Sequence, residues 1–570
     1  MCTVLCEKCA LLFCKFKLRF RNICKEIAHE IAEFFSQLAE CTCLSRTPPR
    51  RRQRSASDHL LLPLLKTGDH ALVLNEECFE ALNDLAASVY ADLQEAAALY
   101  YLYLSHCLES PLPASFMEPL LSLLFSPHPD VQKTTCLSLV NLLVKRNVCE
   151  ELAFEMGVLP PLLEMVQAGD PGARCHACAC VTMLASSESN SDALVSEGVI
   201  PLLVLAKSFD PQVQQNAAWV LLNLTQSVRS RRVLCRAGAV PVLVVLLQCA
   251  DSRVQFYGCS ALLHLAADPE HHARLLHIGE RYLLRALLTL MASPVSKNAC
   301  QACKCLEMLC RNVAVQDQLL ELDCVRPLKT LLSSPVLQCV QSALTLLSAL
   351  ATHPAFHEVL VSEGVCDLMG PMLRRHGSSC DVILHSCAIV LSLGGSCLGR
   401  QALMESECLP GLLQALVSPG TPVEALIRLT SCLHRLMSFE ALQSHLSIMM
   451  TSEEVLRLVK SSGPNGNLQL TYNCIAILST LQMNGQVIGL LRPHYRLLMG
   501  IIVSFFKNQE LKFQHLGITA LCNLIQDADF RAVLSGSELE TEVLRLSERT
   551  EETRQLLSLT GIPPASPQEP

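Results

Sequence analysis

Cysteine thiols are the side chains of this sequence most able to do chemistry, and they gather at its amino terminus. The chain has 570 residues and 31 cysteines. Four of these cysteines stand near its start: Cys2, Cys6, Cys9 and Cys14. Hydrophobic and basic residues alternate between positions 11 and 21, and apolar residues then recur at helical spacing. Thiols beside such a segment are typical substrates of S-acylation, so we predict that residues 1–43 are a membrane anchor acylated on these cysteines.

Two other interpretations of residues 1–43 remain open. The amphipathic segment could be a helix that only caps the main body of the protein. Alternatively, Cys6 and Cys9 could bind zinc together with Cys41 and Cys43, although Cys41-x-Cys43 lacks the spacing of the second pair in a zinc knuckle.

A basic Pro/Ser linker, residues 44–60, follows the leader. An arginine stands three positions before both Ser55 and Ser57, which suits basophilic kinases, so both serines are phosphorylation candidates. Phosphate there would cancel part of the basic patch and weaken its attraction to anionic lipid. Residues 559–570, at the opposite end, are expected to be a disordered tail.

Composition separates the leader from the body. The first 58 residues hold 11 Lys and Arg against 6 Asp and Glu, whereas the remaining 512 hold 34 against 47. Half of the chain is hydrophobic, which excludes a largely disordered protein. The longest nearly apolar run, residues 239–250, is shorter than the roughly 18 residues that cross a membrane, so no transmembrane helix is expected. With no secretory signal, the thiols are expected to stay reduced.

The body lacks the signatures of common catalysts. It has no Gly-x-x-x-x-Gly-Lys, no Gly-x-Gly-x-x-Gly after a strand, no His-Glu-x-x-His and no Gly-x-Ser-x-Gly. Its histidines are scattered, and we expect four of them to be solvated at the ends of structural units: His271, His272, His353 and His357. We therefore predict a protein that is not an enzyme and has no cofactor, metal, small-molecule substrate or nucleic acid as partner.

An internal repeat dominates the body instead. A phrase of the form Gly-x-x-Pro occurs in three clear copies and is followed by three weaker ones: Gly157, Gly198, Gly238, Gly279, Gly364 and near Cys408. Glycine permits the left-handed residue that ends a helix, and proline suits the first turn of the next helix. Each copy therefore predicts two helices joined by a sharp corner.

A second phrase follows each corner and is clearest from Val213 to Leu224. We call Val213 its anchor, because small residues at +4 and +5 and apolar residues at +8 and +11 have helical spacing from it. Eleven positions share this register: Leu93, Val131, Ala173, Val213, Val254, Asn298, Cys339, Val382, Ala425, Leu468 and Phe513. The spacing of these positions and the residue types of the two recurring motifs favour armadillo repeats. We predict an all-α, right-handed superhelical armadillo solenoid of about eleven repeats over residues 61–558.

The same register accounts for the cysteines of the body. Five of them fall at +5, where a small residue is needed at a tight helix crossing: Cys136, Cys178, Cys259, Cys303 and Cys387. The clusters Cys175/Cys178/Cys180 and Cys300/Cys303/Cys305 suggest zinc ligands. Because their central members must face the core, we predict packing instead of metal binding.

Position +10, which we call the rung, is expected to face the concave groove of such a solenoid. The rungs are Tyr103, Asn141, Met183, Asn223, His264, Met308, Ala349, Ser392, Arg435, Leu478 and Asn523. An asparagine amide can both donate to and accept from a peptide backbone, and methionine adapts to apolar segments. We expect extended or helical protein segments to bind here, with these residues in contact: Asn141, Met183, Trp219, Asn223, His264, Met308, Arg435 and Asn523.

These features together resemble the vacuolar protein 8 family. A cysteine-cluster leader precedes about eleven armadillo repeats. Short stretches of sequence also match the family, at Glu155–Gly157, Leu205–Ser208, Ala237–Val244 and Val254–Tyr257. The resemblance implies a lipid-anchored scaffold on the cytoplasmic face of the vacuolar or lysosomal membrane. Its concave groove would capture adaptors for organelle inheritance, membrane contact and autophagy-type targeting.

The chain departs from that family in two ways. Residue 2 is cysteine where the founding member has a myristoylated glycine, so only S-acylation carries over. Glu307 and Ser348 stand where the family has groove arginines, so its partners are not transferred to this chain.

Two soluble alternatives compete with the membrane scaffold. One is a cytosolic armadillo adaptor of the junction or cilium type, which needs no acylation. The other is a nuclear-import adaptor with Arg50–Arg54 as an autoinhibitory stretch. Import receptors need repeated Trp-x-x-x-Asn pairs, and this chain has one, Trp219 with Asn223, and no other tryptophan.

Overall fold

A computed structural model describes residues 74, 76–276, 281–463, 467–481 and 483–546 of the chain. The leader cysteines, Ser55, Ser57 and the tail 559–570 lie outside these residues, so the predictions made for them stay predictions. The chain divides into two compact units, one up to residue 277 and one from residue 278 onward. We call them the first and the second unit.

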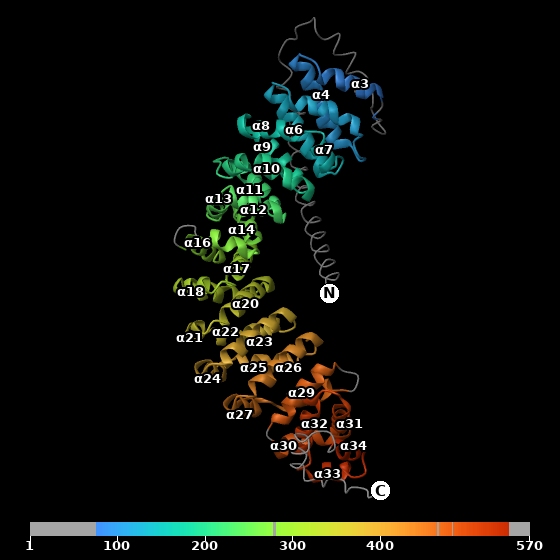
Figure 1. Ribbon diagram of the computed structural model, residues 1–570, viewed down its shortest axis with the longest axis vertical. Helices are drawn as coiled ribbons and strands as arrows, with labels where there is room; N and C mark the ends of the chain where they lie inside the picture. The colour runs from blue at the N-terminus through green and yellow to red at the C-terminus, as the bar shows by residue number, and fades with distance from the viewer. Residues whose placement is uncertain (1–73, 75, 277–280, 464–466, 482, 547–570) are drawn as a thin grey trace, which may run out of the picture. The chain divides into compact units, whose positions relative to one another are not determined.

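Every regular element within the described residues is helical (Figure 1). Eleven helices contain one predicted anchor each, and we call them the ladder helices. In the first unit they are α4 (Ala91–Cys107), α6 (Pro129–Val144), α9 (Pro171–Leu184), α11 (Pro211–Leu224) and α14 (Ser252–Ala266). In the second unit they are α17 (Ser296–Leu309), α20 (Leu337–Ala351), α23 (Cys380–Gly394), α26 (Val423–Leu436), α29 (Leu468–Thr480) and α32 (Leu511–Leu524). The all-α repeat fold is thus confirmed.

Shorter helices join the ladder helices. The first unit has α3 (Glu76–Ala86), η2 (Ala114–Phe116), α5 (Met117–Leu124), α7 (Glu150–Glu155), α8 (Leu159–Ala168), α10 (Glu188–Leu205), α12 (Val228–Arg236), α13 (Ala239–Leu246), η3 (Pro269–His271) and α15 (His272–Leu276). The second unit begins with α16 (Tyr282–Met291), α18 (Val313–Glu321), α19 (Val325–Leu332), α21 (Ala355–Ser362), α22 (Val365–His376), α24 (Cys397–Glu405) and α25 (Cys408–Val417). It continues with α27 (Glu440–Met449), α28 (Ser452–Ser461), α30 (Gly485–Leu491), η4 (Arg492–His494), α31 (Tyr495–Lys507), α33 (Ala528–Leu534) and α34 (Glu538–Leu546).

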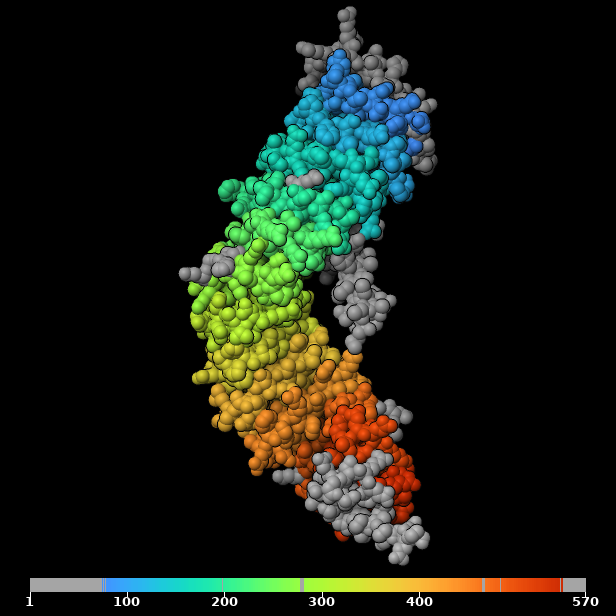
Figure 2. Space-filling model, viewed as in Figure 1, coloured from blue at the N-terminus to red at the C-terminus, as the bar shows by residue number. Residues whose placement is uncertain are grey.

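Neighbouring ladder helices pack against each other within each unit. In the first unit α4 contacts α6, α6 contacts α9, and α11 lies between α9 and α14. In the second unit the same contacts run from α17 through α20, α23, α26 and α29 to α32. Figure 1 shows α18, α21, α24 and α27 along one edge of the second unit, with the ladder helices beside them. Side chains fill the spaces between neighbouring helices in each unit (Figure 2). One continuous core per unit results, as stacked repeats require.

The glycine corners are confirmed at three places and wrong at one. Gly157, Gly238 and Gly364 have φ angles of 85°, 83° and 67°, in the left-handed region that favours glycine. Gly198 lies inside α10, which continues past the expected corner. A Cβ at Gly198 would stand 3.1 Å from Leu163 Cδ2, so this glycine permits a close helix contact instead of a turn.

The anchor register is also wrong at one position. In ten ladder helices the predicted anchor is the third helical residue, but Leu468 is the first residue of α29 and is half exposed. Leu470 is the third residue and is buried, because the Asn467 side chain accepts from the N–H groups of Gln469 and Leu470 and so starts the helix two residues later than the register predicted. The rung of this repeat is therefore Thr480, and Leu478 is a core residue.

One helical stretch among the described residues, Gly485–Lys507, is long and apolar enough to cross a membrane by length and composition alone. The sequence predicted none. Arg492 interrupts this stretch between α30 and α31, and it is paired with Asp527 and Asp529. The side chains of Phe505 and Phe506 on α31 are fully buried where α31 packs against α32 and α34. These contacts are those of a core helix of the last repeats.

Candidate partner-binding groove

The asparagine rungs connect consecutive ladder helices. In the first unit, Asn141 Nδ2 donates to Ser105 Oγ at 3.1 Å and Asn223 Nδ2 donates to the carbonyl of Thr182 at 3.0 Å. In the second unit, Asn523 Nδ2 donates to the carbonyl of Ser479. Each amide therefore uses one N–H to fix the neighbouring repeat and retains its carbonyl and second N–H for another group.

His264 takes the place of an asparagine on α14. Its Nδ1 lies 2.9 Å from Thr225 Oγ1, and the Thr225 hydroxyl donates to the carbonyl of Leu222, so the imidazole N–H is the donor to threonine. Burial, reinforced by the nearby positive charge of Arg231, lowers the pKa of His264 to about 4. This rung is therefore neutral at pH 7.

Aromatic side chains stand beside the Asn223 rung. Trp219 lies one turn before Asn223 on α11, and its ring stacks on Tyr257 of α14 with centroids 5.9 Å apart and planes 16° apart. Phe256 meets the edge of Tyr257 at 6.1 Å. All three rings are partly exposed, so they present an apolar surface with polar edges of the kind that binds peptide segments.

The second unit presents a different surface along its rungs. Met308 is half-buried on α17, and the neighbouring Glu307 carboxyl has a raised pKa because it is partly buried. Ser392 donates to the carbonyl of Ala351 and accepts from His357 Nε2, so it too fixes the preceding repeat. Arg435 is exposed on α26 and is the basic rung of this unit. The thioether and guanidinium rungs, with a carboxylate beside the row, suit a mixed partner segment.

One recurring group of hydrogen bonds was not predicted from the sequence. Six side chains, each 18 residues after an anchor, donate to the backbone carbonyl six positions earlier at 2.7 to 3.2 Å. They are Ser191, Arg231, His272, Gln316, His357 and Arg400. Each satisfies an orphan carbonyl at the end of a ladder helix.

The expectation that the histidines are solvated was wrong, because His271 and His272 are buried and His353 and His357 are half-buried.

The thiols of the two cysteine clusters are core residues, apart from the half-buried Cys175. The predicted +5 cysteines are all buried, and 17 of the 24 cysteines among the described residues are buried. Burial raises the pKa of Cys175 to about 11 and that of Cys305 to about 12. Zinc binds the thiolate, which this burial disfavours.

We expect a chelator to leave the protein unchanged. Treatment with EDTA should not shift the thermal unfolding midpoint, and iodoacetamide should modify the exposed Cys107, Cys149 and Cys397 while Cys178 and Cys303 stay unmodified until the chain unfolds. Mass spectrometry of the alkylated peptides measures this directly. A midpoint lowered by EDTA, with simultaneous labelling of Cys178, would show that the cluster holds a metal.

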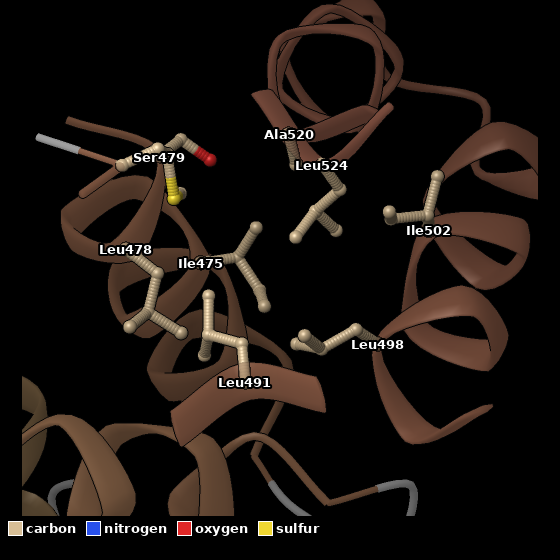
Figure 3. A pocket seen from close by; sticks show the side chains of 9 residues that line it. Ile475, Leu478, Ser479, Leu491, Leu498, Ile502, Ala520 and Leu524 are labelled. Atoms are coloured by element: carbon tan, nitrogen blue, oxygen red, sulfur yellow. The ribbon is translucent and has the colours of Figure 1, made fainter. Parts of the chain in front are cut away.

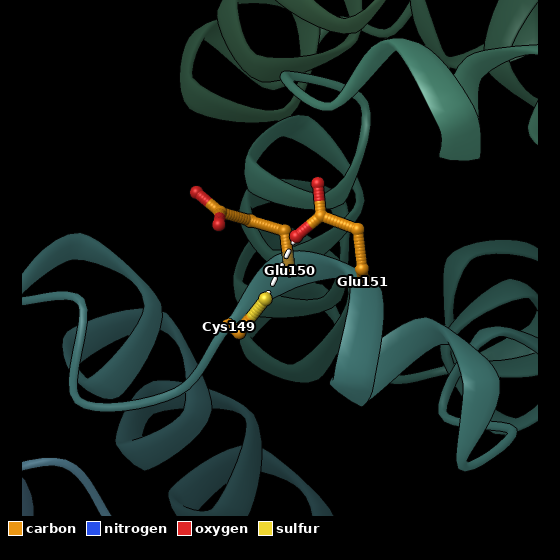
Figure 4. A group of neighbouring side chains, drawn as sticks. All are labelled: Cys149, Glu150 and Glu151. Atoms are coloured by element: carbon orange, nitrogen blue, oxygen red, sulfur yellow. Dashed lines mark hydrogen bonds between the residues drawn. The ribbon is translucent and has the colours of Figure 1, made fainter.

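One group of possible metal ligands stands apart from those clusters, at the start of α7 (Figure 4). Cys149, Glu150 and Glu151 lie together there. Glu151 accepts from Cys149 Sγ at 2.7 Å and from Ser187 Oγ at 2.6 Å, and these bonds lower the pKa of its carboxyl. The Glu151 carboxylate thus already accepts hydrogen bonds from two protein side chains. We assign no metal to these three residues, which stand at the start of a helix of only six residues.

An apolar cavity lies between α29, α31 and α32 in the second unit (Figure 3). Its volume is about 20 Å³, and Ile475, Leu498 and Leu524 are among the side chains that point into it. A site for a small molecule needs roughly 300 Å³ or more. This cavity therefore has room for a water molecule at most and is a packing defect of the core.

Comparisons with known proteins agree with this repeat. The armadillo/beta-catenin-like repeat family matches residues 187–226 and 227–267. Importin subunit alpha-1b of Oryza sativa subsp. japonica is 30% identical over 115 residues, which are 19% of this chain and 22% of the rice protein. The chain thus matches about a fifth of the length of that relative.

Two solved structures share the fold. A chain from a study of how a phosphorylation switch controls the interaction between cadherin and beta-catenin aligns over 84% of this chain and 99% of its own, with a TM-score of 0.58 and 14% identity. An engineered protein aligns over 78% of this chain and 98% of its own, with a TM-score of 0.50 and 19% identity. Two stretches of the chain thus match the armadillo repeat, and the recurring ladder helices together with this likeness show an armadillo-type fold over the described residues.

Proposed function

We propose that this protein is a non-catalytic scaffold that binds other proteins along its ladder helices. The observation that carries the proposal is the Asn223 rung, whose amide retains hydrogen-bonding groups beside the stacked rings of Trp219 and Tyr257. A row of backbone-binding amides and partly exposed rings suits an extended or helical segment of a partner. The solved chain of similar fold comes from a study of the interaction between cadherin and beta-catenin. That use of the fold in binding another protein supports the proposal.

A paired set of variants tests the groove. Trp219→Ala combined with Tyr257→Ala removes the stacked rings, whereas Val233→Ala removes a partly exposed side chain from α12, outside the ladder helices. Proximity labelling in cells should show a set of neighbours that is lost in the double variant and kept in Val233→Ala. An unchanged set in the double variant would show that this part of the groove binds nothing.

We propose further that the leader places this scaffold on the cytoplasmic face of the vacuolar or endolysosomal membrane. The clustered thiols at Cys2, Cys6, Cys9 and Cys14 beside basic and apolar residues support S-acylation. Organelle inheritance, membrane contact and autophagy-type targeting are the roles that this location would serve.

Replacing the four leader cysteines with serine should move the protein from the membrane fraction to the soluble fraction. A single acyl chain binds membranes only weakly, so variants that keep one cysteine should lie between these extremes. Hydroxylamine, which cleaves thioesters, should release the wild type to the same extent. A wild-type protein that is soluble before hydroxylamine treatment would contradict the anchor and favour the soluble armadillo adaptor.

The rice importin match favours a second candidate, a soluble import adaptor. Its weakness is that this chain has a single tryptophan to pair with a rung asparagine. A nuclear-import assay with a basic cargo peptide separates the two, since the scaffold should not carry that peptide into the nucleus.

A further inference from the structure

The helix α12 carries an unusual concentration of positive charge. Four arginines stand within its nine residues, at 229, 231, 232 and 236, and the helix contains no acidic residue. The body around it is acidic, since residues 59–570 hold 47 Asp and Glu against 34 Lys and Arg. Such a local excess of positive charge attracts anions to this side of the first unit.

Two of these arginines border a polar depression on the surface of the first unit. The depression has a volume of about 280 Å³ and is lined by Arg232 and Arg236 of α12, by Glu270 and His271 of η3, and by Arg274 of α15. Three guanidinium groups thus come together from two helices, α12 and α15, that precede and follow the ladder helix α14. Guanidinium groups bind phosphate through paired, charge-assisted hydrogen bonds.

The charges in the depression are only partly compensated. Glu270 pairs with Arg232 at 3.2 Å. Arg236 and Arg274 are exposed and form no ion pair with any residue in the described part of the chain. The depression therefore has a net positive charge that an external anion would neutralise.

His271 provides an independent indication of a ligand. Its side chain lines the depression although it is only 5% exposed, and its Nε2 has no hydrogen-bond partner in the described structure. Asp268 Oδ2, the acid opposite this nitrogen, stands 3.8 Å away, beyond hydrogen-bonding distance. A buried polar atom without a partner is unfavourable, and a phosphate oxygen in the depression would supply the missing acceptor.

We propose that this depression binds a phosphate group carried by a phosphoserine or phosphothreonine of a partner protein. A recess with three converging arginines and a buried histidine suits a compact dianion, whereas attraction to a lipid surface needs only a flat basic patch. The site lies on α12, η3 and α15, outside the ladder helices, and so goes beyond the groove proposed above. A partner held in the groove could be bound a second time here after phosphorylation.

Fluorescence anisotropy with the full chain tests the proposal. The probes are a fluorescent acidic nonapeptide with a central phosphoserine and the same peptide with serine. The phosphopeptide should bind at least tenfold more tightly, and inorganic phosphate should compete with it. Arg236→Ala with Arg274→Ala should weaken binding about a hundredfold, or about tenfold for each charge-assisted contact.

Two further variants sharpen the test. Glu270→Gln should strengthen phosphopeptide binding severalfold, because it removes the carboxylate that competes for Arg232. Arg229→Ala is the matched control, since Arg229 is on the same helix but does not line the depression. It should change the affinity by no more than about twofold, as expected for the loss of an exposed charge.

Three results would overturn the proposal. Equal affinity for the phosphorylated and unphosphorylated peptides would show that only net charge matters. An unchanged affinity in the Arg236/Arg274 double variant would place binding elsewhere. Vesicles containing phosphatidylserine that bind the wild type and release the double variant, together with no phosphopeptide binding, would assign the depression to a membrane surface.

Discussion

Replacing Gly370 with leucine should destabilise the second unit by at least about 3 kcal/mol. Gly370 lies on α22, where that helix crosses α25. A Cβ at this position would stand 2.2 Å from the carbonyl oxygen of Glu407 and 2.6 Å from its Cβ. The facing Gly411 leaves no room either, because its own Cβ would be 3.0 Å from Gly370 Cα. Only separation of the two helices would accommodate the side chain.

Urea unfolding followed by circular dichroism at 222 nm measures this effect. The matched control is Gly500→Ala on α31, where a Cβ would meet nothing within 4 Å. That substitution should stabilise the protein by about 0.5 to 1 kcal/mol, since glycine is unfavourable inside a helix. A Gly370→Leu variant that unfolds at the wild-type urea concentration would mean that α22 and α25 do not cross as closely as described.

Acid should weaken the first unit through His264. The pKa of this imidazole is about 4 in the folded protein, below its ordinary value of 6.5. Between these values the unfolded chain binds a proton that the folded chain does not, so stability falls as the pH falls from 6.5 to 4. The loss from this residue reaches about 3 kcal/mol at pH 4 and is absent above pH 7.

His264→Asn should remove this part of the pH dependence. An asparagine amide can still donate to Thr225 Oγ1, as the rung asparagines donate to their neighbours, but it has no proton to gain. Urea unfolding midpoints at pH 7.5 and pH 5 should differ less in the variant than in the wild type. The internal control is the interval from pH 7.5 to 8.5, where the two proteins should respond alike. Identical acid sensitivity in both proteins would exclude His264 as its source.

The repeat could be predicted from the sequence because the apolar side chains that are buried in each repeat must recur at fixed positions. Anchors such as Val131 and Val382 must face the core, and the spacing of apolar residues after them follows from the helix period. Leu468 was misplaced because Leu468 and Leu470 are both apolar and the spacing could not choose between them. A capping signal was available, since Asp170, Asp210 and Asp251 stand three positions before their anchors, as Asn467 does before Leu470.

The connections between repeats were harder to predict. His272 and His357 had no evident partner in the sequence, because their acceptors are backbone carbonyls, which leave no signature in residue types. The recurrence of polar side chains 18 residues after six of the anchors was a signal that could have found them. Similarly, the Asn223 rung could be placed on the groove, whereas its bond to Thr182 depends on how the neighbouring repeat packs.

Site-specific photocrosslinking tests the groove most directly. Benzoylphenylalanine placed at Met183 or Met308 replaces a rung of each unit, and the same residue at Val204 or Ile448 replaces an exposed side chain outside the ladder helices. Irradiation in cells should give discrete adducts with other proteins from the two rung positions and none from the two outer positions. Adducts from Val204 and Ile448 alone, or from all four positions equally, would contradict a scaffold that binds its partners along the ladder helices.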